Sequence, residues 1–168
     1  MTIELRPAEA GDVATLLDLI RRLAEVQDAA GYVRSSPEDL LRDGFGPAPR
    51  FHALLAESVD PASHRREAVG LALYYFTYST WAGRPNLYIE DLYVDPDRQG
   101  AGIGRRLMAA LAGKAVEAGC SRLELAVKTD NRARAFYERL GLVRKGSWLP
   151  YAVEGEGLRM LADAAGRP

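Results

Sequence analysis

The stretch from Glu90 to Arg106 constrains the fold more than any other part of the chain, because a strand-like segment runs there through a glycine cluster into a helical pattern. The first N–H groups of a helix have no partner within the helix, and the helix dipole makes that end positive. Glycines let the backbone approach a ligand closely. A strand, a glycine turn and a helix start in this order therefore predict a binding place for phosphate.

The spacing of the glycines separates this turn from two common nucleotide loops. A Walker loop requires Gly-Lys followed by Ser or Thr, a combination that the chain lacks. A dinucleotide fingerprint requires Gly-x-Gly-x-x-Gly, but Gly100, Gly102 and Gly104 alternate, and Arg105 stands where the third glycine belongs. What remains is a hexapeptide that begins at Gln99. Taken alone it is more typical of a turn without a ligand, and its place between a strand and a helix favours the phosphate site.

Hydrophobic periodicity and turn residues predict an order of elements that interleaves strands and helices. The predicted elements are strands at 2–6, 51–57, 69–78, 87–94 and 122–127, helices at 12–27, from Ser36-Pro37, at 102–118 and at 131–140, and a final pair of strands at 142–153 and 158–161. This order predicts an α/β (α+β) fold with a mixed central sheet flanked by helices. The crossover through 102–118 makes strands 87–94 and 122–127 parallel, which puts the glycine turn at the carboxyl end of the first.

Composition and charge narrow the class of protein. A chain of 168 residues with 48% apolar and 27% charged residues fits one domain, which we expect over 1–163 with a frayed tail at 164–168. The net charge of −1 offers no general attraction for nucleic acid. The lone Cys120 argues against an internal disulfide and a cysteine-based metal site, and no metal is expected. The absence of a membrane-length apolar run or a signal-peptide core predicts a cytoplasmic protein without a membrane partner.

Three landmarks in the expected order resemble the GNAT superfamily of N-acetyltransferases: Arg6-Pro7 before the first helix, Gln99–Gly104, and the Ala-Phe-Tyr motif at 135–141. Within this superfamily, the chain is similar to the diamine (spermidine/spermine) and thialysine acetyltransferase branch at three places: Asp43–Gly46, the aromatic run Leu73–Tyr78 with Trp81, and Tyr88–Asp91. The resemblance implies acetyl-CoA as co-substrate, a small primary amine as acceptor, and a homodimer.

Acetyl transfer to an amine needs two proton transfers, because an ammonium must lose a proton before it attacks and the departing thiolate must gain one. The resemblance implies Glu90 as the base, acting through a water, and Tyr137 as the acid. Glu90 lies in an apolar strand, where burial favours the protonated form of a carboxyl group. The competing interpretations are a solvated or ion-paired acid for Glu90 and a core aromatic residue for Tyr137.

The resemblance also implies the residues that hold the two substrates. Backbone groups of Leu92, Tyr93 and Val94 would pair with the pantetheine arm and polarise the thioester carbonyl. The other predicted cofactor-binding residues are Gln99, Gly100, Ala101, Gly102, Ile103, Gly104, Arg105, Asp130 and Asn131. The predicted substrate-binding residues are Glu90, Asp91, Trp81, Tyr78 and Asp28. Strand alternation puts Tyr74, Phe76 and Tyr78 on one face and Tyr75 and Thr77 on the other, so at most one set lines the pocket.

The chain departs from the polyamine enzymes at three places. Ser79 stands where an acid normally precedes the tryptophan, the acids at the end of the first helix are reduced to Glu25 and Asp28, and Asp130 stands where an asparagine is usual, with Asn131 next to it. These departures weaken the prediction of a polyamine substrate. The alternatives are a protein amine or an aminoglycoside as acceptor, or a non-catalytic acyl-CoA-binding module. The presence of both predicted catalytic residues argues against the module.

Overall fold

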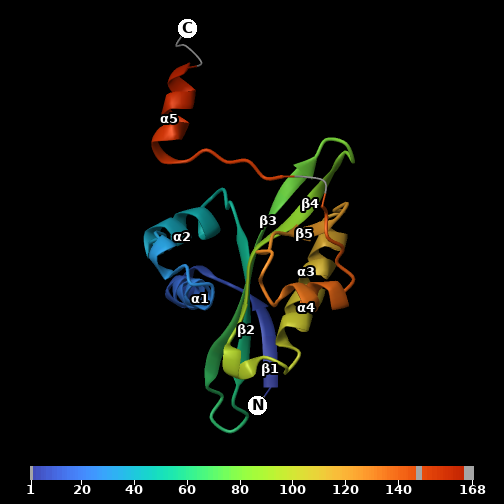
Figure 1. Ribbon diagram of the computed structural model, residues 1–168. Helices are drawn as coiled ribbons and strands as arrows, with labels where there is room; N and C mark the ends of the chain where they lie inside the picture. Colours follow the sequence, from blue (N-terminus) through green and yellow to red (C-terminus); the bar gives the residue numbers. More distant parts are fainter. Residues whose placement is uncertain (1, 147–148, 165–168) are drawn as a thin grey trace. The chain divides into compact units, whose positions relative to one another are not determined.

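The computed structural model describes residues 2–146 and 149–164, in two compact units that divide after Lys128. The first unit contains β1 (Thr2–Pro7), α1 (Val13–Val26), α2 (Pro37–Phe45), β2 (His52–Val59), β3 (Arg66–Ser79), β4 (Arg84–Val94), α3 (Ile103–Glu117) and β5 (Leu123–Leu125), with short 3-10 helices at Ala10–Asp12, Ala30–Tyr32 and Pro96–Arg98 (Figure 1). The second unit contains α4 (Arg134–Arg139) and α5 (Gly155–Ala164).

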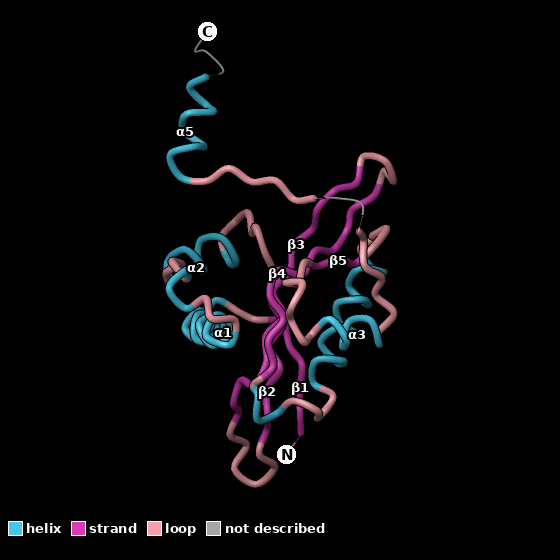
Figure 2. The backbone as a smooth tube through the Cα atoms, viewed as in Figure 1, coloured by secondary structure: helices cyan, strands magenta, loops and turns pink. Residues whose placement is uncertain are grey.

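The five strands form one mixed sheet in the order β1-β2-β3-β4-β5 (Figure 2). All neighbours are antiparallel except β4 and β5, which are parallel. The parallel pair is joined through α3, as the crossover argument predicts. The predicted mixed sheet flanked by helices is therefore confirmed.

Helices cover both faces of this sheet in the first unit: α1 and α2 lie on one face and α3 on the other (Figure 1). On the α1 face, Leu16 and Leu19 pack with Leu55, Leu71 and Tyr93. On the α3 face, a Cβ added at Gly70 would lie 3.1 Å from Tyr93 O and 3.3 Å from Ala56 Cβ, so the glycine fits the close packing of the adjacent strands, and Ile103 Cγ2 of α3 lies at an ordinary contact distance of 3.5 Å. The β4–α3 turn is thus held between two packed layers.

The pairing of β3 with β4 contains a bulge at Glu90. Leu73 is opposite Asp91 and Tyr74 is opposite Ile89, which leaves Glu90 as the extra residue of β4. A bulge breaks the alternation of side chains along a strand. Consequently Asp91 lies on the α1 face, whereas strict alternation would put it on the same face as Ile89.

A network of ion pairs on the α1 face gives Arg6, near the end of β1, a structural role. Arg6 donates to both carboxylate oxygens of Asp12, at 2.6 and 2.8 Å, and to Glu57 at 2.8 Å. The buried Glu57 also accepts a hydrogen bond from Arg66 at 2.9 Å. The hydrogen bond from Arg6 holds the pKa of Glu57 below its ordinary range. These contacts tie β1, the start of α1 and the β2–β3 pair together.

The prediction of a final pair of strands is wrong. The described residues of 142–153 form neither strand nor helix, and 158–161 lies inside α5. A short apolar run such as Leu-Arg-Met-Leu fits a strand and a helix equally well by periodicity. Residues 147 and 148 lie outside the described residues, as do 165–168 of the expected frayed tail, while Ala164 ends α5. The extent of the domain, 1–163, stays a prediction.

Candidate functional site

The turn between β4 and α3 is lined by backbone. Gly100 has φ of +84°, and Gly102, which caps the N-terminus of α3, has φ of +78°. This left-handed region is costly for residues with a Cβ atom. No atom lies within 4 Å of the place that a Cβ would take at either glycine, so the turn is open on the side where a ligand can approach.

The N-terminus of α3 supplies hydrogen-bond donors for an anion. No side chain caps it, and the first helical N–H with a partner is that of Arg106, which donates to Gly102 O at 3.1 Å. The N–H groups of Ile103, Gly104 and Arg105 precede it and have no acceptor within the helix. Such a set of donors with the helix dipole fits a diphosphate. Among the described residues, no His, Cys, Asp or Glu side chains cluster as a metal site.

Side chains around the turn hold it in place. Gln99 Nε2 donates to the carbonyl oxygen of Val94 at 3.3 Å, which braces the turn against the end of β4. Arg106 donates to the carbonyl oxygen of Ile3 at 2.8 Å and so ties α3 to β1. Arg105 is exposed beside the helix start. The structure therefore leaves Arg105, rather than Arg106, available at the predicted phosphate site.

The second half of β4 has an open edge. β5 pairs only with Leu87–Ile89, so from Glu90 to Val94 the strand has β3 on one side and no strand of the described chain on the other. Backbone N–H and C=O groups of alternate residues point out along such an edge. The predicted residues Leu92, Tyr93 and Val94 lie in this segment, which leads directly into the glycine turn.

Glu90 is exposed, in contrast to the burial expected from its apolar neighbours. The bulge takes it out of the alternating pattern that would bury it. Its carboxylate accepts a hydrogen bond from the hydroxyl of Tyr75, with 3.2 Å between Oη and Oε2. Glu90 is thus a water-accessible carboxylate held by one phenol.

Asp91 is the acid whose protonation the fold changes. It is half-buried, and desolvation together with the negative charge of Glu90 raises its pKa to about 6. The rings of Tyr75 and Tyr88 lie 5.2 Å apart on the same face as Asp91. We call Tyr75, Tyr88, Glu90 and Asp91 the acid–tyrosine cluster. Tyr75 was one of the aromatic residues that the alternation left open for the acceptor pocket, of which only Tyr78 was predicted as a substrate-binding residue, and Tyr88 was not predicted as a site residue.

The remaining predicted acceptor residues are Tyr78, Trp81 and Asp28. The register places Tyr78 on the α3 face, opposite to Asp91, and both Tyr78 and Trp81 are exposed. Asp28 follows the end of α1 in a left-handed conformation and is exposed. The end of α1 meets the segment after β5, because Lys128 Nζ donates to Gln27 O at 3.3 Å. The structure therefore brings Glu90 and Asp91 together and leaves Tyr78 on the other face.

The second unit carries the predicted acid. Tyr137 lies in α4 and is half-buried, its ring centroid is 5.2 Å from that of Phe136, and burial raises the pKa of its phenol. Asn131 Oδ1 accepts the N–H of Ala133 at 2.8 Å, in the turn just before α4. Asp130, immediately before it, is exposed. Of these two candidates for the usual asparagine, Asn131 is the one that shapes the backbone.

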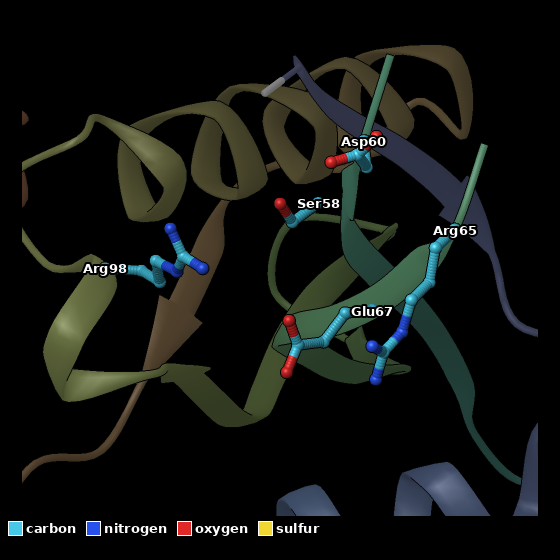
Figure 3. Close-up of a pocket in the computed structure, with 5 residues that line it drawn as sticks. All are labelled: Ser58, Asp60, Arg65, Glu67 and Arg98. Atoms are coloured by element: carbon cyan, nitrogen blue, oxygen red, sulfur yellow. The ribbon is translucent and has the colours of Figure 1, made fainter. Parts of the chain in front are cut away.

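A separate cavity of about 390 Å³ lies beside the β2–β3 hairpin (Figure 3). Ser58, Asp60, Arg65, Glu67 and Arg98 line it. The buried hydroxyl of Ser58 has no hydrogen-bond partner among the described residues. No predicted site residue lines this cavity, and its charges are mixed. The chemistry therefore points to the glycine turn and the acid–tyrosine cluster instead.

Known proteins are similar to this chain over most of its length. The model of the acetyltransferase (GNAT) family matches residues 17–142. Thialysine N-epsilon-acetyltransferase of Bos taurus is 42% identical over 95% of this chain and 97% of its own, and that of Caenorhabditis elegans is 32% identical over 88% and 89%. Spermidine/spermine N(1)-acetyltransferase-like protein 1 of Homo sapiens is 39% identical over 80% of this chain and 19% of its own.

Solved structures share the fold. An integron cassette protein from the mobile metagenome of V. cholerae superimposes with a TM-score of 0.75 and 26% identity, over 96% of this chain and 98% of that one. An aminoglycoside acetyltransferase from an uncultured soil metagenomic sample has a TM-score of 0.73 at 21% identity, over 90% and 97%, which shows a common fold alone. No helix in the described part of the chain is long and apolar enough to cross a membrane.

Proposed function

The chain belongs to the acetyltransferase (GNAT) family and is an acetyl-CoA-dependent N-acetyltransferase, and we propose that its acceptor is the primary amine of a small cationic molecule, such as a diamine or a lysine-like amino acid. The observation that carries the proposal is the acid–tyrosine cluster, which spans β3 and β4 where the open edge of β4 begins and leads to the glycine turn. A cation is recognised there by charge, next to the place where the acetyl group arrives.

Backbone groups hold acetyl-CoA in this proposal, and the co-substrate supplies the acetyl thioester. The free N–H groups at the start of α3 bind the diphosphate. The open edge from Leu92 to Val94 pairs with the amide groups of the pantetheine arm, as an added strand would. Because these contacts use the main chain, the side chains of Leu92 and Val94 contribute little specificity.

Glu90 accepts the proton that the attacking ammonium must lose. Its exposure fits transfer through an intervening water, and the hydroxyl of Tyr75 orients its carboxylate. The nitrogen then forms the new bond to the acetyl carbon while the carbon–sulfur bond breaks. Tyr137 donates its phenolic proton to the departing sulfur, and burial keeps that phenol protonated at neutral pH until the transfer.

Asp91 binds the positive charge of the acceptor that does not react. With a pKa of about 6 it is ionised at neutral pH, and it gains more from a bound ammonium than a fully hydrated acid does. The rings of Tyr75 and Tyr88 add cation–π attraction on the same face. A molecule with two positive groups therefore fits better than a neutral amine.

The acceptor is more consistent with a lysine-like amino acid than with a long polyamine. Ser79 replaces an acid of the polyamine enzymes, and the end of α1 carries only two acids, Glu25 and Asp28, both exposed. Relatives of nearly full-length similarity are thialysine acetyltransferases.

A single cysteine, Cys120, which forms no disulfide, fits a reducing compartment, and we place the enzyme in the cytoplasm.

The test is CoA release measured with a panel of acceptors: thialysine, lysine, putrescine, spermidine, an aminoglycoside and a peptide with a free N-terminus. We expect thialysine or lysine to give the highest kcat/KM. Glu90→Gln should lower kcat by about a hundredfold or more, whereas Glu124→Gln, an acid of β5 already paired with Arg122 at 2.7 Å, should stay close to the parent enzyme. Turnover with the peptide or the aminoglycoside alone would favour the alternative acceptors instead.

A further inference from the structure

The cavity beside the β2–β3 hairpin has a polar wall that the acetyl transfer does not use (Figure 3). Ser58 of β2 is directly opposite Glu67 of β3, and the next pair toward the hairpin loop is Asp60 and Arg65, where Asp60 N donates to Arg65 O at 3.0 Å. Alternate residues of a strand face the same way, and all four side chains line the same cavity. We call these four residues the hairpin wall. Arg98, just before the glycine turn, lies across the cavity from it (Figure 3).

Ser58 presents a hydroxyl that lacks a partner. The residue is 3% exposed, and its Oγ makes no hydrogen bond within the described part of the chain. A buried polar atom in this state is unfavourable until something satisfies it. Figure 3 shows the hydroxyl turned toward the side of the cavity where Arg98 lies. A ligand oxygen between Ser58 and Arg98 would satisfy it.

Two charged side chains of the hairpin wall are available to a ligand, and one is not. Asp60 shapes the hairpin loop, because its Oδ1 accepts the N–H groups of Ala62 and Ser63, both at 2.8 Å. Arg65 and Glu67 are exposed, and their side chains make no ion pair or hydrogen bond with any described residue. The cavity therefore offers a positive side, made by two arginines and the serine hydroxyl, and one negative group at Glu67.

Both signs of charge in one small cavity favour a zwitterion. A carboxylate fits the arginines and the Ser58 hydroxyl, since arginine pairs with carboxylates through parallel hydrogen bonds, and an ammonium fits Glu67. Side chains directly opposite each other on paired strands begin about 4.5–5.5 Å apart, so the two charges of the ligand must be close together. The α-carboxylate and α-ammonium of a free amino acid meet this condition, whereas Glu67 repels a simple anion. The volume of about 390 Å³ is typical of a small-molecule site.

We propose that this cavity binds a free α-amino acid, at a site distinct from that of acetyl transfer. Arg98 directly precedes Gln99, and Ala101 N donates to Arg98 O at 3.4 Å, so a ligand that holds Arg98 also steadies the glycine turn. The amino acid should therefore tighten CoA binding by about threefold or more. This link rests on the proposed role of the turn, whereas the binding of the amino acid does not.

Calorimetry of the whole chain with L-alanine, L-glutamate and L-lysine tests the site, with propionate and ethylamine as analogues that carry one charge each. We expect at least one amino acid to bind with a Kd below about 1 mM, and both analogues to bind at least about tenfold more weakly. Glu67→Gln and Arg65→Gln should each weaken amino-acid binding by about tenfold or more, since each removes a charged hydrogen bond. Glu38→Gln, which removes an exposed acid of α2, is the matched control and should bind like the parent protein.

Ser58→Ala should weaken amino-acid binding by about two- to tenfold without lowering the urea midpoint, because the lost hydroxyl has no partner within the described chain. Binding of none of the amino acids, or equal binding of propionate, overturns the proposal. Binding that survives Glu67→Gln and is lost in Asp91→Asn places the ligand at the acceptor site and overturns it as well. An unchanged Kd for CoA at a saturating amino-acid concentration overturns only the link to the glycine turn.

Discussion

Replacing Asp91 with asparagine should make the enzyme more stable and less active. The fold raises the pKa of Asp91 from its ordinary value of 3.8 to about 6, because burial and the charge of Glu90 disfavour the carboxylate. A tenfold change in proton affinity is worth about 1.4 kcal/mol, so the ionised side chain costs the fold up to about 3 kcal/mol at neutral pH. Asparagine has nearly the same shape and no charge to bury.

The sign of the pH dependence follows from the raised pKa. Below pH 3.8 Asp91 is protonated in both the folded and the unfolded chain and costs nothing. As the pH rises through about 6, the unfolded chain is already ionised while the folded one must ionise a half-buried group, so stability is lost. Asp91→Asn should therefore gain stability at pH 8, by at most about 3 kcal/mol, and gain almost none near pH 3.5.

Urea denaturation at both pH values measures the stability, and CoA release measures the activity. With a dicationic acceptor, Asp91→Asn should raise KM by about ten- to a hundredfold at pH 8, because a charged hydrogen bond is worth about 1.5–3 kcal/mol. The parent enzyme should lose kcat/KM below pH 6, and the variant should lose this dependence. Glu117→Gln, which removes an exposed acid at the end of α3, is the control for stability. An equal gain at both pH values, or an unchanged KM, would contradict the reasoning.

Three further changes test other parts of the molecule. Gly102→Val should abolish CoA binding in calorimetry, because valine is strained at φ of +78° and narrows the turn. The control Gly113→Val, at an open position of α3, should still bind CoA. Normal CoA binding by Gly102→Val would contradict the proposed phosphate site. Tyr137→Phe should lower kcat by about a hundredfold with an unchanged Kd for CoA, and an unaffected kcat would remove its role as acid. Glu57→Gln should cost about 3 kcal/mol of unfolding free energy at pH 7, because it leaves the buried end of an ion pair unmatched. The cost should decrease as the pH falls below 4.5, since a carboxylate with a lowered pKa contributes stability above its ordinary pKa and loses it as the pH falls through the folded value. The half-exposed Glu4→Gln should change stability by less than about 1 kcal/mol at any of these pH values.

The glycine turn and its neighbours were predictable because their signals are local. Three signals lie close to Gly102 in the sequence: a β-rich segment, glycines able to adopt positive φ, and an apolar stripe at helical spacing. The same holds for α2, where Ser36 accepts the N–H of Asp39 in the predicted cap, at 3.1 Å. The prediction of two C-terminal strands was wrong because the local pattern around Leu158 is too short to decide between a strand and a helix.

The chemistry of the acids was not predictable from local pattern. The chain places Glu90 and Asp91 side by side, and their apolar neighbours indicate burial for Glu90. The bulge reverses this: Glu90 leaves the ladder and is exposed, while Asp91 turns toward the α1 face and is the acid with the raised pKa. The same register selects Tyr75, rather than Tyr78, as the companion of the acids.

The glycine turn and the motifs that identify the family were therefore already contained in the order of residues, because each motif occupies a short stretch of chain. Which carboxylate is buried, which tyrosines accompany it and how far the edge of β4 stays open were decided only when distant strands paired. A shift of one residue in strand register moves every following side chain to the other face, and no local preference records where that shift occurs.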